Sequence, residues 1–229
     1  MKILSFILLF SLKTSLLLAQ KTVIKILEFH PFYGEKELQA DDAFLMETDS
    51  ITIETFRFYI SGVELLQGDK TVWKEQKSYH LIDASSPSTL AISLQIPSRL
   101  SCTNIRFNIG IDSITNTSGA MGGDLDPTKG MYWTWQSGYI NFKLEGKSNQ
   151  CTSRNKEFQF HIGGYQYPFN ALQKVKLPFN SSAKNKISIN IKKLLDAVDL
   201  KNSSHIMSPG ENAVQLSSRL PELFQSMQP

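Results

Sequence analysis

The chain has 229 residues, of which 41% are hydrophobic and 20% are charged, and its formal net charge is +3. The hydrophobic content is enough for a substantial core and excludes a disordered chain. The small net charge provides no long-range attraction to nucleic acid or to an anionic membrane, so we expect neither as a partner.

Residues 1–20 have the pattern of a secretory signal peptide, with Lys2 at the start, an apolar run and the small residue Ala19 near the end. Lys13 interrupts the apolar run, which argues against a membrane-spanning helix. Cleavage would remove Lys2 and Lys13 and leave 22 basic against 21 acidic residues. We therefore expect a periplasmic or secreted protein in which residues 21–229 form a single domain with no membrane span.

Apolar and polar residues alternate along most of this domain, which is typical of strands with one buried face. In chain order, the expected strands lie at residues 23–29, 51–60, 63–66, 79–82, 105–111, 133–139, 158–162 and 187–191. Gly62 permits a turn or bulge between the second and third of these. Many short strands joined by turns predict an all-β fold, specifically an antiparallel β-sandwich.

Helical spacing is clear in one segment, where apolar residues fall at positions 191, 194, 195 and 198. The tail from Asn202 onward is rich in Ser, Pro and Gln, but it contains four apolar residues that suit a docked helix: Leu216, Leu220, Leu223 and Phe224. One or two short helices are therefore expected near the C-terminus.

The two cysteines, Cys102 and Cys151, both follow the expected signal peptide. An even number of cysteines in an oxidising compartment favours a disulfide between them. The alternative, a pair of thiolate metal ligands, lacks the close spacing of cysteine metal motifs.

The segment at residues 130–139 is rich in aromatic side chains. Read as a strand, it places Trp133, Trp135 and Tyr139 on one face. Such a face is either part of the core or a wall around a ligand or metal. Just before it, Asp124 and Asp126 have the alternate spacing of calcium ligands, but the ligand set is incomplete and turn formation is the favoured interpretation.

No nucleophile elbow, phosphate-binding glycine loop or catalytic cysteine pattern is present, so we expect a protein that is not an enzyme. The four histidines, His30, His80, His161 and His205, form no local metal motif. Each one taken alone is more often a hydrogen-bonded structural residue than a ligand. Strands far apart in sequence can still bring such residues together.

Several segments, taken together, resemble a known family. They are residues 58–65, 79–83, 109–113, 126–139 and 160–164, and the most specific of them reads Gly-Met-Tyr-Trp-Thr-Trp-Gln-Ser-Gly-Tyr. In this order they resemble the MbnP-like domain, named for a copper-binding periplasmic protein associated with methanobactin. The resemblance covers roughly residues 23–224.

The resemblance implies an exported all-β protein that binds copper, with a protein partner in copper handling. Copper-binding members of the family use histidines and a tryptophan oxidised to kynurenine. By position, Trp133, Trp135 and His161 match the family pattern, and His80 and His205 are further candidate ligands. The alternative function is a non-catalytic β-sandwich module that binds a peptide, glycan or protein through its aromatic residues.

Overall fold

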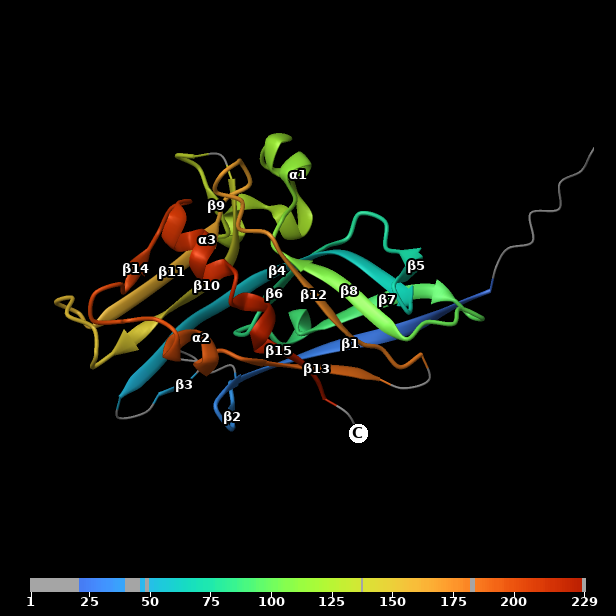
Figure 1. Ribbon diagram of the computed structural model, residues 1–229, viewed down its shortest axis with the longest axis horizontal. Helices are drawn as coiled ribbons and strands as arrows, with labels where there is room; N and C mark the ends of the chain where they lie inside the picture. Colours follow the sequence, from blue (N-terminus) through green and yellow to red (C-terminus); the bar gives the residue numbers. More distant parts are fainter. Residues whose placement is uncertain (1–20, 40–45, 48–49, 137, 182–183, 228–229) are drawn as a thin grey trace, which may run out of the picture.

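The structure is a computed structural model that describes residues 21–39, 46–47, 50–136, 138–181 and 184–227. The expected signal peptide, residues 1–20, lies outside the described residues. Two β-sheets and a few short helices make up the fold (Figure 1). The helices are α1 (Ser113–Thr117), α2 (Lys192–Asp196) and α3 (Glu211–Ser217), and the 3-10 turns are η1 (Pro87–Thr89), η2 (Gly123–Leu125), η3 (Pro127–Lys129) and η4 (Leu220–Leu223).

The smaller sheet has five strands: β1 (Thr22–Tyr33), β2 (Lys36–Glu37), β7 (Ala91–Pro97), β13 (Asn185–Asn190) and β15 (Phe224–Met227). The larger sheet has ten: β3 (Met46–Glu47), β4 (Ile51–Gln67), β5 (Lys70–Lys74), β6 (Tyr79–Asp83), β8 (Asn104–Ile109), β9 (Tyr132–Trp133), β10 (Gly138–Ser148), β11 (Glu157–Gly163), β12 (Gln173–Pro178) and β14 (His205–Ile206). Most neighbouring strands are antiparallel, but β1 with β13 and β11 with β14 are parallel. The prediction of an all-β sandwich is confirmed, with these two parallel pairings as the exceptions.

The main core lies between the two sheets and is rich in phenylalanine. Phe29 of β1 meets Phe58 of β4 and Phe107 of β8 edge to face, with ring centroids 6.1 and 6.2 Å apart. All three side chains are at most 1% exposed. Edge-to-face contact between such rings adds to the free energy gained from burying their area. This core therefore holds the sheets together and leaves the other face of the larger sheet available for a second set of contacts.

Strand β4 organises the larger sheet because it pairs with β10 and β8 in turn along its length, and also with β3, β5 and β6. Residues 51–58 pair with β10, and residues 60–66 pair with β8. Between Ser61 and Glu64 the register shifts, and Gly62 there has a φ of +57°, a left-handed conformation that favours glycine. The bulge expected at Gly62 is confirmed.

The segment between β8 and β10 folds over the outer face of the larger sheet and forms a second, smaller core. Its residues come from the segment and from the strands beneath it: Tyr59, Leu81, Ile111, Leu125, Met131, Trp133, Tyr139 and Ile140. Tyr59 and Tyr139 pack edge to face at 5.8 Å, and the Tyr59 hydroxyl donates to the Asp124 carbonyl. Helix α1 lies at the start of this segment. The sequence pattern did not predict a helix there.

The prediction of one continuous strand at residues 133–139 is wrong. The chain makes a turn after Trp133, so that Gly138 pairs with Trp133 and Tyr139 pairs with Tyr132. The reversal gives the two indoles different surroundings: Trp133 is 6% exposed, whereas Trp135 is 66% exposed. Alternation along a single strand therefore does not describe them, and they do not share a buried face.

The short helices near the C-terminus are confirmed as α2 and α3. Leu194 and Leu195 of α2 are buried, as the helical spacing predicted. The four apolar residues of the tail are also buried, one in α3, two in η4 and one in β15. Within the described residues, no helix has both the length and the apolar character needed to cross a membrane.

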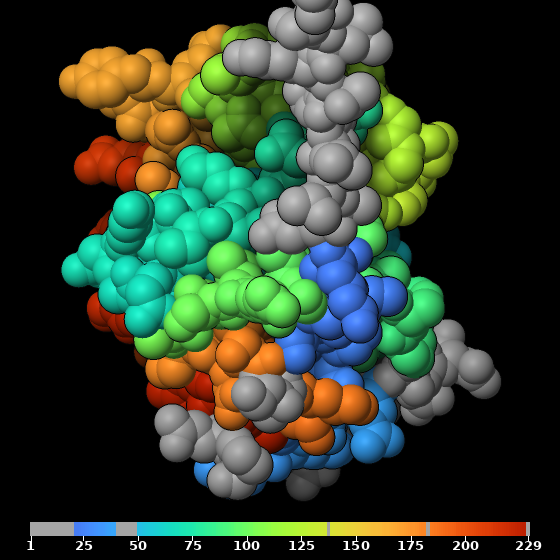
Figure 2. Space-filling model, turned by 90° about the vertical axis from the view of Figure 1, so that its right-hand side faces the viewer, coloured from blue at the N-terminus to red at the C-terminus, as the bar shows by residue number. Residues whose placement is uncertain are grey.

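The predicted disulfide is wrong, because Cys102 and Cys151 are both buried free thiols. Cys102 lies in the connection between β7 and β8. Part of the chain near residue 100, coloured green, lies on the face shown in Figure 2. Thr103, the next residue, bonds to Leu66 at one end of β4, whereas Cys151 follows β10 beyond its pairing with Ile51 at the other end. Leu66 and Ile51 are fifteen residues apart on β4, and at about 3.3 Å per residue this separates the two ends by tens of ångströms. A disulfide cannot join cysteines at such a distance.

Candidate metal centre on the outer face

The outer face of the larger sheet carries a row of polar side chains across four strands. In the strand register, Asp83 of β6 lies opposite Arg57 of β4, and Arg57 lies opposite Lys143 of β10. Lys143 in turn lies opposite His161 of β11. Directly opposed residues on neighbouring strands lie close enough for their side chains to interact. The row therefore depends on the register of the sheet and not on proximity in the sequence.

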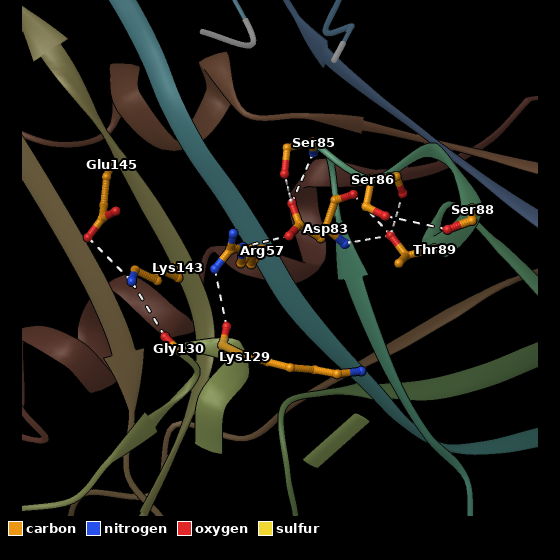
Figure 3. A network of polar contacts seen from close by, with 10 residues as sticks. All are labelled: Arg57, Asp83, Ser85, Ser86, Ser88, Thr89, Lys129, Gly130, Lys143 and Glu145. Atoms are coloured by element: carbon orange, nitrogen blue, oxygen red, sulfur yellow. Dashed lines mark hydrogen bonds and ion pairs between the residues drawn. The ribbon is translucent and has the colours of Figure 1, made fainter. Parts of the chain in front are cut away.

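The two cations of this row hold the turn that leads into β9 (Figure 3). Arg57 forms an ion pair with Asp83, with Nε and Oδ2 2.7 Å apart, and donates a hydrogen bond to the carbonyl of Lys129 at 3.1 Å. Lys143 donates to the carbonyl of Gly130 at 3.4 Å. Both carbonyls belong to the end of η3, so these contacts fix the chain just before Trp133.

His161 is held by a carboxylate. Its Nε2 lies 2.6 Å from Oε1 of Glu145, and the side chains are 9% and 22% exposed. Burial alone would raise the pKa of Glu145, but hydrogen bonds from His161 and Thr55 and the charge of Lys143 outweigh it and lower the pKa to about 2. Glu145 is therefore ionised at neutral pH and fixes the orientation of the imidazole ring.

Trp133 of β9 packs on β11 at Gly163, close to His161. A Cβ atom built on Gly163, two residues beyond His161, would come 2.7 Å from the Trp133 ring. Residues two apart on a strand share a face, so the indole covers the position next to His161 on the outer face. Trp135 then packs on Trp133, with ring centroids 6.2 Å apart, and extends the aromatic group to the surface.

His205 belongs to the same edge. Strand β14 runs parallel to β11, and His205 pairs with Gln159, two residues before His161. The segment after β14 stays close to the end of β11, since a Cβ built on Gly164 would lie 3.1 Å from Cβ of Pro209. His205 is exposed, and its Nδ1 lies 2.8 Å from the hydroxyl of Ser204. The structure thus brings four of the five predicted metal residues, His161, His205, Trp133 and Trp135, to one region.

His80, the fifth, does not join them. It lies on β6, where Nε2 is 2.8 Å from Oε2 of Glu75, and both β4 and β10 lie between β6 and β11. Three strand spacings of about 4.8 Å separate it from His161. His30 lies on β1 in the other sheet, 2.9 Å from Glu37.

Asp124 and Asp126 make the contacts of turn residues. Asp124 accepts a hydrogen bond from the Leu81 N–H and forms an ion pair with Lys129 at 2.7 Å. Asp126 caps η3 by accepting from the backbone and the side chain of Thr128. Hydrogen bonds from Thr128 lower the pKa of Asp126. These contacts agree with the turn interpretation, and calcium stays an untested alternative.

The donor set suits copper better than a metal that needs several carboxylates. In the part of the chain that the structure describes, no three His, Cys, Asp or Glu side chains group as a metal site. Imidazole nitrogen is a good ligand for copper. A ligating histidine commonly donates its other ring N–H to a carboxylate, which is the role that Glu145 can fill for His161. The imidazoles of His161 and His205 are therefore of the donor type that copper takes.

Sequence reasoning did not identify Arg57, Lys143 and Glu145 as parts of this region. Lys143 and Glu145 alternate with apolar residues on β10, and this alternation was the available signal. It identifies the outer face of one strand, but not the partners across three strands.

The family model for MbnP matches residues 22–208. No curated protein matches the chain. Among solved structures, MbnP from Methylosinus trichosporium superposes with a TM-score of 0.56 and 15% sequence identity, over 83% of this chain and 82% of that one. The structural likeness shows a shared fold, and the family match extends over most of the sequence. The chain therefore belongs to the MbnP family.

Proposed function

We propose that this protein works outside the cytoplasm as a non-catalytic copper-binding protein, with the imidazoles of His161 and His205 as ligands. The observation that carries the proposal is the pair formed by His161 and Glu145, set beside Trp133 and His205 in a chain of the MbnP family. The metal ion is its cargo, and a second protein in copper handling is its expected partner.

Each nearby residue has a distinct role in this proposal. The carboxylate of Glu145 accepts a hydrogen bond from the Nε2–H of His161, which leaves Nδ1 as the nitrogen that binds the metal. Trp133 is 6% exposed and shields the ring from water, while Arg57 and Lys143 keep the preceding turn in place. Trp133 is also the indole next to the imidazole, so it is the tryptophan expected to be modified if copper chemistry oxidises one.

The test is copper titration of the exported protein against a competing chelator, together with elemental analysis and intact mass. We expect stoichiometric copper and a loss of affinity of about tenfold or more in His161→Ala and His205→Ala. His80→Ala and His30→Ala are matched controls, because they remove histidines that also have carboxylate partners. Absence of copper in the wild type, or equal losses in all four variants, would contradict the proposal.

A second candidate function, binding of a peptide, glycan or protein, is favoured by exposed rings beside the same region. Tyr167 is 98% exposed and Trp135 is 66% exposed. A pocket of about 210 Å³ near them has no charged side chain in its lining, which is Gln136, Gly164, Tyr165, Gln166, Tyr167, Pro168, Phe169 and Pro209. If this is the function, Tyr167→Ala weakens ligand binding and leaves copper affinity unchanged.

A further inference from the structure

Met207 lies next to the proposed ligands, on the segment that continues β14 along β11. Ile206 pairs with Phe160 and is 8% exposed, so it points into the core. Side chains alternate along an extended chain, and Met207 is 40% exposed, as expected for the outer face. Pro209 lies against Gly164. Met207 is therefore held between two points of contact with β11, beside His161.

A further donor beside the two imidazoles would have to be a side chain other than His, Cys, Asp or Glu. His161 and His205 supply two imidazoles, and within the described ranges no further His, Cys, Asp or Glu completes a group of three. Glu145 is engaged by His161 and Lys143. A thioether adds a ligand without adding charge, and it is a soft donor that favours copper(I) over harder divalent ions.

Building on the proposed function, we propose that Met207 is a third ligand and sets the preference of this site for copper(I) over zinc(II). Zinc sites in proteins are built from thiolate, imidazole and carboxylate donors, so a thioether contributes little to zinc affinity. The imidazoles provide affinity for either metal, and the sulfur of Met207 distinguishes between them.

The test compares Met207→Leu with the wild type in two titrations, one with copper(I) under anaerobic conditions and one with zinc(II), each against a competing chelator. Leucine is close to methionine in volume, and an exposed position tolerates it. We expect copper(I) affinity to fall about tenfold or more and zinc(II) affinity to stay the same. Met227→Leu is the matched control, because Met227 is 37% exposed and lies on β15 of the other sheet.

A second readout reports on the sulfur itself. With methionines labelled at the methyl carbon, addition of copper(I) should shift the NMR signal of Met207 and leave that of Met227 in place. Unchanged copper(I) affinity in Met207→Leu, equal losses for both metals, or an unshifted Met207 methyl signal would overturn the role of Met207 alone. A wild-type protein that retains no copper(I) would overturn the proposed function as well.

Discussion

The six-membered ring of Trp133 lies directly against the backbone of Gly163. A Cβ atom at position 163 would come 2.7 Å from Cζ3 and 2.8 Å from Cη2 of the indole. Carbon atoms in contact are normally 3.5–4.0 Å apart, so no side chain fits there. One missing side chain on β11 thus permits a buried tryptophan beside His161.

We expect Gly163→Ala to destabilise the protein by about 1–3 kcal/mol, because the added methyl group would overlap with neighbouring atoms. On its other side it would meet the carbonyl oxygen of Tyr139 at 2.7 Å, which is backbone. Urea unfolding followed by tryptophan fluorescence measures both the loss of stability and the displaced indole. Gly122→Ala is the control, since no atom lies within 4 Å of a Cβ built there and its φ is −93°. Equal stability of the two variants would disprove this account of Trp133.

Asn116 ties α1 to the start of β10. Its amide group donates to the carbonyls of Ile111 at 2.9 Å and Asp112 at 3.0 Å, and its oxygen accepts from the Tyr139 N–H at 2.8 Å. The residue is 3% exposed, so Asn116→Ala leaves backbone groups buried without partners. We expect a loss of about 2 kcal/mol or more in the free energy of unfolding.

Hydrogen exchange locates the effect of Asn116→Ala. Protection should fall in residues 111–139, the segment that carries Trp133, while the core between the two sheets stays protected. Asn212→Ala, at an exposed position of α3, is the control. Uniform loss of protection throughout the protein would show that Asn116 supports the whole fold and not this segment.

Glu64 should make stability depend on pH in the acid range. Burial would raise its pKa, but hydrogen bonds and charge from Lys74 and Arg106 lower it below the ordinary value of 4.5. A carboxylate with a lowered pKa in the folded state stabilises the protein above about pH 4.5, and this contribution is lost as the pH falls further. Glu64→Gln should therefore cost about 1–3 kcal/mol at neutral pH and flatten the decline in stability between about pH 5 and 3.

Urea unfolding at a series of pH values measures both effects of Glu64→Gln. Glu222→Gln is the control, because Glu222 pairs with Arg219 on the surface and its side chain is 58% exposed. The interpretation fails if the pH dependence of Glu64→Gln is parallel to that of the wild type.

Most strands were predictable because their pattern is local. Alternation around Phe58, Phe107 and Phe160 identified β4, β8 and β11, and each of these side chains is fully buried. The shorter strands have too few residues for their sequence to show an alternating pattern. Strand β14 has only two residues, and its parallel pairing with β11 depends on contacts that no spacing within it expresses.

The candidate site was predictable only in part, for the same reason. Resemblance and residue type identified His161 and Trp133, but their proximity depends on Gly163, which has no distinctive feature in the sequence beyond being a glycine. The pairing of His161 with Glu145 depends on the register between β10 and β11. His80 was a further candidate ligand from its residue type, but the order of strands and its pairing with Ile60, a residue of the main core, separate it from His161.

The two cysteines give a prediction that differs from the disulfide expected from the sequence. Because Cys102 and Cys151 lie near opposite ends of β4, the purified protein should contain two free thiols per chain without added reductant. Burial raises the pKa of both thiols, so the reactive thiolate is scarce and alkylation of the folded protein should be slow. In guanidinium chloride both should react at once, and mass spectrometry counts the added groups. An unfolded chain that takes up no alkylating reagent would show that the cysteines are oxidised and that β4 does not hold them apart.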